Sequence, residues 1–383
     1  MMDWKKSVKQ ISVNAARVVL GVTFILSGFA KAVDPLGTQY KLTDYLAAMN
    51  LADILPDWTL LIASVALSTI EFALGAFILA AIQRRLVSRL ALLMMSVMTI
   101  ITIWIFIANP VQDCGCFGDA IVLSNGETLL KNIILLACTV LIVLYPMDIK
   151  RILPKGVQWV VIHTTVIALL GLSIWCLYDL PILDFRPYHV GADIRKGMEI
   201  PEGAEQPEYE TTFILEKDGK QQEFTLDNYP DSTWTFIDSK TKTIKEGYVP
   251  PIHDFSIINQ DGNDITDVVL NDKGYTFLLI SPTLGKADDS NFGDIDQTYE
   301  FAQDNNCAFY CLTASNDDEV NHWKDITGAE YEFCETDGTT LKTIVRSNPG
   351  LLLIKEGVII GKWSHNRLPD AQTLKDLIGN KLH

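Results

Sequence analysis

The stretch NPVQDCGCFGD, residues 109–119, separates two long apolar runs and organises the rest of the chain. Pro110 cannot continue a helix, because it lacks a backbone N–H and its ring clashes with the preceding turn. Cys114 and Cys116 follow, with one glycine between them. A cysteine pair in a polar loop between two membrane-length segments predicts a chemical site at a bilayer surface.

Five apolar segments each come near the roughly 20 residues that cross a bilayer. They cover about residues 11–30, 58–82, 86–109, 128–146 and 157–178. We therefore predict an α-helical membrane bundle of four helices in residues 1–150. The fifth segment, within residues 151–182, is predicted to be a membrane-spanning tether to the C-terminal half of the chain.

Basic residues mark one side of this bundle. They gather before the first segment and in the second and fourth connections: Lys5, Lys6, Lys9, Arg84, Arg85, Arg89, Lys150, Arg151 and Lys155. The positive-inside rule then predicts a cytoplasmic N-terminus and, after five crossings, an extracytoplasmic C-terminal half. We expect a multi-pass protein of the bacterial inner (cytoplasmic) membrane with a periplasmic C-terminal domain. Cleavage of residues 1–32 as a signal peptide stays open as an alternative.

Charge separates the two halves of the chain. Residues 1–182 carry 13 Lys and Arg against 11 Asp and Glu, whereas residues 183–383 carry 18 against 36. The acidity of the second half argues against nucleic acid as a partner, because phosphate backbones require clustered cations. No C-x-x-C pair and no Cys/His cluster with zinc spacing occurs, so no metal site is predicted.

Ionisable residues inside the apolar segments are expensive and therefore candidates for function. Glu71 lies near the middle of the second segment, and Arg17 lies about two turns inside the first. We predict that these two side chains form an ion pair. Such a pair would serve helix packing or would mark a proton or quinone site. Lys31, at the outer end of the first segment, is expected to extend into the membrane interface.

The spacing of the two loop cysteines favours redox exchange over stapling. A ring closed through one residue is strained, and strained disulfides are labile. Gly115 suits such a ring because it tolerates unusual backbone angles. An exposed pair on the outer side is predicted to exchange with a partner thiol, since disulfides persist there. A passive disulfide and pairing with other cysteines remain alternatives.

The first four segments resemble a known membrane family. The runs from Arg17 to Gly21 and from Ser27 to Lys31 resemble the opening of DoxX-type proteins. Together with Glu71 and the run DCGCFG at 113–118, they are similar to the MauE branch (methylamine utilisation) over residues 11–146. The resemblance implies a small bundle similar to quinone-linked thiol oxidases, with quinone as its conceivable cofactor. It also implies a role in maturing a disulfide-rich envelope protein beside a separate thioredoxin-like partner.

The outer half is predicted to begin with an irregular linker and a small β-hairpin region, residues 183–249. The hairpin covers 209–215 and 222–226 around the turn at 217–220, and residues 234–237 add a strand before a turn near 240–247. From residue 250, strands at 255–258, 277–280, 308–313, 331–334, 351–354 and 358–363 alternate with helices at 294–305, 317–326, 340–345 and 370–378. Such alternation predicts an α/β domain with a mixed sheet.

Residues 250–383 resemble the thioredoxin fold of membrane-tethered thiol reductases. Pro349 matches the cis-proline of that family, and a glycine-turned hairpin follows it. The family's C-x-x-C belongs at residues 281–286, where this chain has no cysteine. Thioredoxin redox chemistry is therefore not carried over. Cys334 is expected to be free or to pair with Cys307.

Two functions are predicted from the sequence. In the first, Cys114 and Cys116 exchange disulfides with envelope protein clients or with a separate C-x-x-C protein, and the thioredoxin-like domain binds clients. In the second, the chain is a non-enzymatic membrane scaffold with a degenerate thioredoxin-like domain. The missing C-x-x-C weighs against the first hypothesis, and the strained cysteine pair weighs against the second.

Overall fold

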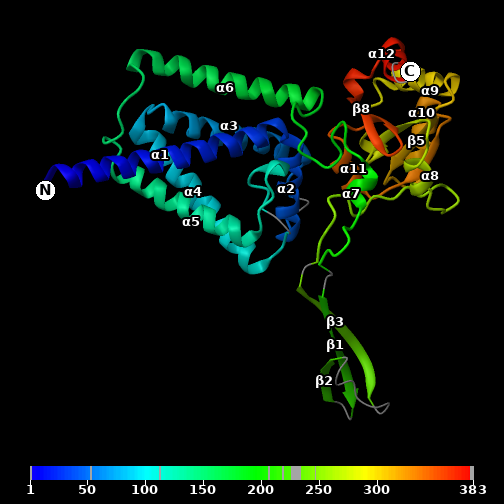
Figure 1. Ribbon diagram of the computed structural model, residues 1–383, viewed down its shortest axis with the longest axis horizontal. Coiled ribbons are helices and arrows are strands. Elements are labelled where there is room, and N and C mark those ends of the chain that lie inside the picture. Colours follow the sequence, from blue (N-terminus) through cyan, green and yellow to red (C-terminus); the bar gives the residue numbers. More distant parts are fainter. Residues whose placement is uncertain are drawn as a thin grey trace.

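The computed structural model describes residues 2–51, 54–111, 114–205, 208–217, 220–225, 234–245 and 247–379. Three parts follow one another along the chain (Figure 1): a helical bundle, a small three-stranded sheet, and a mixed-sheet domain at one end of the bundle.

Within the part of the chain that the structure describes, five helices of the bundle are long and apolar enough to cross a membrane, which matches the number of predicted spans. They are α1 (Met2–Val33), α3 (Asp57–Leu79), α4 (Arg84–Ala108), α5 (Asn125–Leu144) and α6 (Lys155–Tyr178). The shorter helix α2 (Pro35–Ala48) was not predicted. It begins where the Asp34 side chain accepts a hydrogen bond from the backbone N–H of Gly37.

Glycines set the register between α1 and α3. A Cβ atom on Gly28 would lie 2.4 Å from the backbone nitrogen of Phe72, and one on Gly75 would lie 2.7 Å from the carbonyl oxygen of Gly21. Glycine at these positions permits two backbones to approach closely, as in other membrane helix pairs. This register decides which polar side chains of the two helices meet.

The connections sort to two ends of the bundle, as predicted. At the basic end, Lys9 forms an ion pair with Asp148 at 2.7 Å, and Arg84 donates a hydrogen bond to the carbonyl of Ile149. The opposite end carries α2, the cysteine loop and the mixed-sheet domain (Figure 1). The cysteine loop and the C-terminal domain therefore lie at the same end of the bundle.

The small sheet has the order β2–β1–β3, with β1 (Glu208–Lys217), β2 (Lys220–Thr225) and β3 (Thr235–Lys245). It confirms the predicted hairpin, whose turn residues 218 and 219 lie outside the described residues. The predicted turn near 240–247 is wrong, since β3 continues to Lys245. Pairing with β1 along residues 208–216 satisfies the backbone of this polar stretch.

The mixed sheet has the order β6–β5–β4–β7–β8. Its strands are β4 (Tyr275–Ser281), β5 (Ala308–Thr313), β6 (Glu332–Glu335), β7 (Gly350–Lys355) and β8 (Val358–Ser364). The central strand β4 is parallel to β5 and antiparallel to β7, and all its residues are buried. The predicted mixed sheet is confirmed.

Helices cover both faces of this sheet because the side chains of β4 alternate. Phe277 and Leu279 pack towards α9 (Phe292–Asp304), α10 (Asp317–Thr327) and α12 (Ala371–Gly379). Leu278 and Ile280 pack towards α8 (Thr266–Leu270) and α11 (Gly338–Ile344).

Two predictions before β4 need correction. Residues 255–258 do not form a strand; only Ile258 forms isolated bridges, to Asp264 and Glu335. The segment predicted as an irregular linker contains the helix α7 (Ile194–Met198). Around the start of α7, the N–H groups of Gly191 and Ile194 donate to the carbonyls of Ile359 and Gly357, so the segment covers the free edge of β8.

The peptide bond between Asn348 and Pro349 is cis, as predicted from the resemblance. Pro349 lies immediately before β7, at the end of β4 where the side chains of Ser281 and Asn348 are hydrogen-bonded at 2.7 Å.

Candidate functional site

The cysteine loop is closed by caps at both of its helices. Asn109 ends α4 in a left-handed conformation with φ 45°. Ser124 begins α5 with a capping box, in which its hydroxyl accepts from the N–H of Glu127 while the Glu127 carboxylate accepts from Ser124. Gly115 adopts φ +61°, a backbone conformation that favours glycine. Gln112 and Asp113 lie outside the described residues.

The structure brings Cys114 and Cys116 together. Their sulfur atoms are 2.9 Å apart, and both residues are free cysteines. Each residue is only 7% exposed, so the prediction of an exposed pair is wrong. Phe117 of the loop and apolar side chains of α4 pack around the two cysteines. The α4 side chains are Met98, Ile101, Trp104 and Ile105.

The bundle also holds the backbone of both cysteines. The Tyr45 hydroxyl of α2 donates to the carbonyl of Cys114 at 2.5 Å. The Ser27 hydroxyl of α1 donates to the carbonyl of Cys116 at 2.5 Å. Two different helices therefore fix the loop on either side of Gly115.

The two thiols differ in acidity. The hydrogen bond from Cys114 lowers the pKa of the Cys116 thiol to about 6 against the effect of burial, with help from Lys131 and Lys31. The same hydrogen bond and burial raise the pKa of Cys114 well above its ordinary value. Cys116 is therefore the more acidic thiol of the pair.

The predicted ion pair between Arg17 and Glu71 is wrong. Glu71 forms an ion pair with Lys31 at 2.6 Å, and Lys31 is only 3% exposed instead of extending into the interface. Lys31 also donates to the hydroxyl of Ser27 at 3.1 Å. One chain of contacts thus runs from Glu71 through Lys31 and Ser27 to the carbonyl of Cys116.

Arg17 lies at the basic end of the bundle, away from this chain of contacts. Its guanidinium donates to the carbonyls of Ile78 and Leu79 and to the side chain of Asn14. These carbonyls belong to the last turn of α3, beyond which the helix supplies no further donors, although the carbonyl of Ile78 also accepts from the N–H of Ala81. Arg17 therefore caps a helix.

A small cavity lies in the bundle beneath Cys116. It is lined by polar side chains of three helices, Ser27, Glu71, Lys131 and Asn132, and by methionines of α4. Its volume of about 20 Å³ holds one water molecule. A quinone ring does not fit in this cavity, so the residues that line it do not support a quinone site there. Among the described residues, no three His, Cys, Asp or Glu side chains gather as metal ligands do.

A larger groove opens on the other side of Gly115, between α2 and α11. Its volume is about 230 Å³, and both the bundle and the C-terminal domain line it. The stem of Lys41 lies over Gly115, where an added Cβ would come within 3.0 Å of its Cγ atom. The groove leads from the surface to the backbone between the two cysteines.

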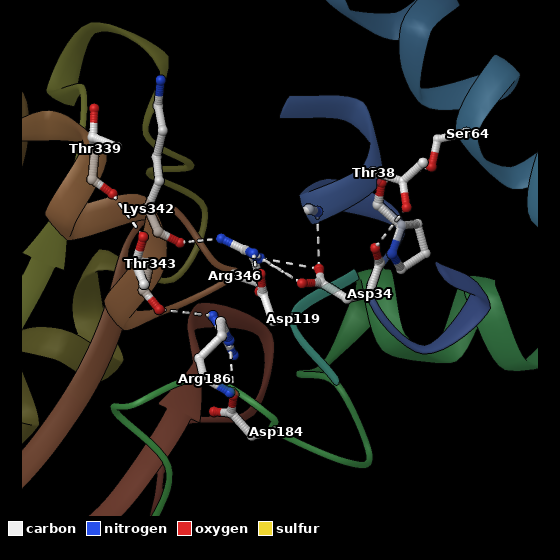
Figure 2. Close-up of polar contacts among 12 residues, drawn as sticks. Asp34, Thr38, Ser64, Asp119, Asp184, Arg186, Thr339, Lys342, Thr343 and Arg346 are labelled. Atoms are coloured by element: carbon white, nitrogen blue, oxygen red, sulfur yellow. Dashed lines mark hydrogen bonds and ion pairs between the residues drawn. The ribbon is translucent and has the colours of Figure 1, made fainter. Parts of the chain in front are cut away.

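Arg346 joins the two parts of the molecule beside this groove. Figure 2 shows its guanidinium reaching from the end of α11 to the carboxylate of Asp34, and Asp119 of the cysteine loop also accepts from it. The distances are 2.9 Å to Asp34 and 3.1 Å to Asp119. Burial opposes the charge on Arg346, but the two carboxylates outweigh it and raise its pKa. A second buried arginine, Arg186, donates to the carbonyl of Thr343 nearby (Figure 2).

The remaining outer cysteines form no pair. Cys311 and Cys334 are buried on opposite faces of the sheet, and Cys307 packs on the face of Cys311. Of the two alternatives for Cys334, pairing with Cys307 is therefore wrong and the free thiol is confirmed; Cys311 is a core residue. Burial raises the pKa of Cys334 to about 12, which keeps it an unreactive thiol.

Several residues of the site were not identified from the sequence. Ser27, Tyr45 and Lys131 contact the cysteine loop or line its cavity, and Asp34 and Arg346 bind the two domains together. Only Lys131 gave a usable signal, because it is a charged residue inside a membrane-length apolar run.

Comparisons with known proteins agree with the membrane part of the structure. Residues 9–145 match the family described as methylamine utilisation protein MauE, which covers the first four spanning helices and the cysteine loop. Residues 209–246, the small sheet, match a family described as a domain of unknown function (DUF8463). With five apolar helices, the chain is a multi-pass membrane protein.

Part of the chain has a distant structural neighbour, described as "Solution structure of a putative protein disulfide isomerase from Bacteroides thetaiotaomicron". It is 16% identical, and the match covers 33% of this chain and 86% of that one with a TM-score of 0.27. A score this low does not establish a shared fold. No curated protein matches the sequence.

Proposed function

We propose that this protein is a thiol–disulfide exchange component of the bacterial cell envelope, with Cys114 and Cys116 as its redox pair. The observation that carries the proposal is the 2.9 Å separation of two free thiols in a loop that the bundle holds at both carbonyls. A thiolate beside a thiol in a fixed loop is the arrangement that disulfide exchange requires.

The exchange needs no group besides these thiols and a partner disulfide. The Cys116 thiolate attacks one sulfur of the partner's disulfide, so a mixed disulfide forms and the partner's other sulfur leaves as a thiolate. Cys114 then passes its proton to the partner's released thiolate and attacks the sulfur of Cys116. The mixed disulfide breaks, Cys114 and Cys116 become joined, and the partner's second sulfur leaves as a thiolate that takes a proton from solvent. The partner is reduced by two electrons and the pair is oxidised; the reverse sequence oxidises a partner dithiol.

The loop is proposed to face the periplasm. The basic connections lie at the opposite end of the bundle, which the positive-inside rule assigns to the cytoplasm. The C-terminal domain shares the end of the loop and is thus extracytoplasmic. Disulfides form and persist in that compartment.

The C-terminal domain is proposed to be thioredoxin-like and to bind clients rather than exchange electrons. The support is its five-stranded mixed sheet, with β4 between the parallel β5 and the antiparallel β7. At the end of β4 the chain has Ser281 and then Leu284 and Lys286, with no cysteine. The expected partners are envelope protein clients or a separate protein with an intact C-x-x-C.

The test is capture of the mixed disulfide in native membranes. Cys114→Ala leaves Cys116 beside Lys131 without its resolving thiol, so it should accumulate covalent adducts that dithiothreitol releases. Cys116→Ala leaves only Cys114, whose pKa burial still raises, and should accumulate fewer. The absence of adducts from both variants, with the full chain present in the membrane, would refute disulfide exchange.

Burial of the cysteines favours a second function, a membrane scaffold without thiol chemistry. At 7% exposure, neither thiol is open to a protein partner in the docked arrangement of the two domains. A scaffold predicts no adducts in the capture experiment. It also predicts that the double variant Cys114→Ser/Cys116→Ser keeps the scaffold function of the wild type. Exchange predicts the opposite on both counts.

A further inference from the structure

Lys131 is a charged residue inside a membrane-length helix with no carboxylate partner among the described residues. It lies in the second turn of α5, within one of the five candidate spans. Its ammonium sits 4.5 Å from the centre of the Phe117 ring, next to Cys116 in the loop. Charges at such positions are costly and mark functional sites.

We propose that Lys131 is the positioning residue that keeps Cys116 as the nucleophilic thiolate of the pair. The proposal rests on the proposed disulfide exchange and assigns the electrostatic control of that site. Lys131 and Cys116 line the same water-sized cavity, whose wall also includes Ser27 and Glu71. The Phe117 ring holds the ammonium in place through a cation–π contact.

Charge balance in this cavity supports the assignment. Glu71 is neutralised by Lys31 at 2.6 Å, so these two residues contribute no net charge to the buried site. Lys131 is the remaining cation of the cavity wall. A thiolate at Cys116 supplies the missing negative charge, whereas a neutral thiol would leave the ammonium uncompensated.

Among the described residues, the other groups beside the pair are mostly neutral, and Lys41 lies on the groove side of Gly115. On α2, Tyr45 bonds to the carbonyl of Cys114 and the Lys41 stem covers Gly115 from the groove side. The α4 helix contributes only apolar side chains and methionines. In the loop, Asp119 is directed to Arg346. Consistent with this, Lys131 lowers the pKa of Cys116 more than Lys31 does.

The experiment follows the alkylation rate of Cys116 by iodoacetamide against pH, in the reduced full-length protein in lipid nanodiscs. Mass spectrometry of the peptide that contains the loop assigns the modified cysteine. Lys131→Gln should move the midpoint of the profile upward. Each unit of that shift lowers the thiolate fraction at pH 5 about tenfold. Lys131→Arg keeps the charge and should keep the midpoint near that of the wild type.

Lys9→Gln is the matched control. Lys9 also sits 4.5 Å from an aromatic ring, that of Tyr145, but at the opposite end of the bundle. Its loss should leave the midpoint unchanged. Phe117→Leu provides a second variant that keeps the charge of Lys131 and removes its ring contact; a smaller upward shift is expected. If Lys131→Gln does not fold, the midpoint measured for Phe117→Leu alone tests the role of Lys131.

An unchanged midpoint in Lys131→Gln, or in Phe117→Leu where that variant decides alone, would overturn the proposal. So would an equal shift in Lys9→Gln. The measurement needs no protein partner, so its failure is distinct from failure of disulfide exchange, which the capture of mixed disulfides tests separately.

Discussion

The buried ion pair between Lys31 and Glu71 gives the sharpest stability prediction. Its two charged atoms are 2.6 Å apart and both side chains are almost fully buried. Lys31→Met would leave the carboxylate of Glu71 buried without a partner. Breaking a buried pair in this way costs about 3–5 kcal/mol, or roughly two to nearly four powers of ten in the folding equilibrium.

The double variant Lys31→Met/Glu71→Leu separates the pair from the packing of its side chains. Replacing both partners by apolar residues of similar size is often neutral or stabilising. We therefore expect the double variant to be more stable than Lys31→Met alone. The free energy of unfolding is measured by titrating mixed micelles with sodium dodecyl sulfate. A loss below about 1 kcal/mol in Lys31→Met, or a double variant no more stable than the single one, would refute the reasoning.

Three further predictions concern the loop and its docking. Arg346→Met should release the C-terminal domain from Asp34 and increase the distance between α2 and α11, measured with paired spin labels. Arg346→Lys should retain much of the docking. Equal distances in the wild type and both variants would contradict this. Gly115→Ala should cost about 1–3 kcal/mol, because φ +61° is unfavourable for alanine and its Cβ would crowd Lys41, and unchanged thermal unfolding would contradict it. Folding lowers the pKa of Cys116 from 9.0 to about 6, so the unfolded chain binds more protons than the folded chain between these pH values. The free energy of unfolding of the reduced protein should therefore rise with pH from about 6 to 9. Cys116→Ser should abolish that rise, and a parallel rise in the variant would contradict the assignment.

The number and approximate positions of the spanning helices could be predicted because each apolar run is close to bilayer thickness, although α1 begins at Met2, well before the predicted residue 11. The basic connections likewise predicted which loops share an end. Helix α2 could not be predicted from the length of an apolar run, because it is short and contains both polar and apolar residues. Its start depends on one side-chain cap, the bond from Gly37 to Asp34.

The partner of Glu71 could not be predicted because it depends on the register of two antiparallel helices. Gly28 meets Phe72 and Gly75 meets Gly21, and this register places Lys31 beside Glu71. By the same register, Arg17 reaches the last turn of α3. Hydropathy says nothing about which helix faces approach closely, so either cation was an equally good candidate.

The cysteine pair was predicted as a site, but its surroundings were not. Burial of both thiols arises from tertiary contacts with the neighbouring helix α4 and with α1 and α2, which come from distant parts of the sequence. The contact between Arg346 and Asp34 spans 312 residues and joins two domains. Long-range contacts of this kind leave no periodic signal in the sequence.

The central claim is that Cys114 and Cys116 exchange two electrons as a pair. In the most direct measurement, the reduced full-length protein in nanodiscs is mixed with a partner protein that carries a disulfide. The reaction is quenched with acid, and the remaining thiols are alkylated. We predict the loss of two alkylation sites, both mapped to Cys114 and Cys116, with the same number of thiols gained by the partner. If Cys114 and Cys116 both stay reduced with a partner disulfide that oxidises ordinary protein dithiols, the result would contradict the account.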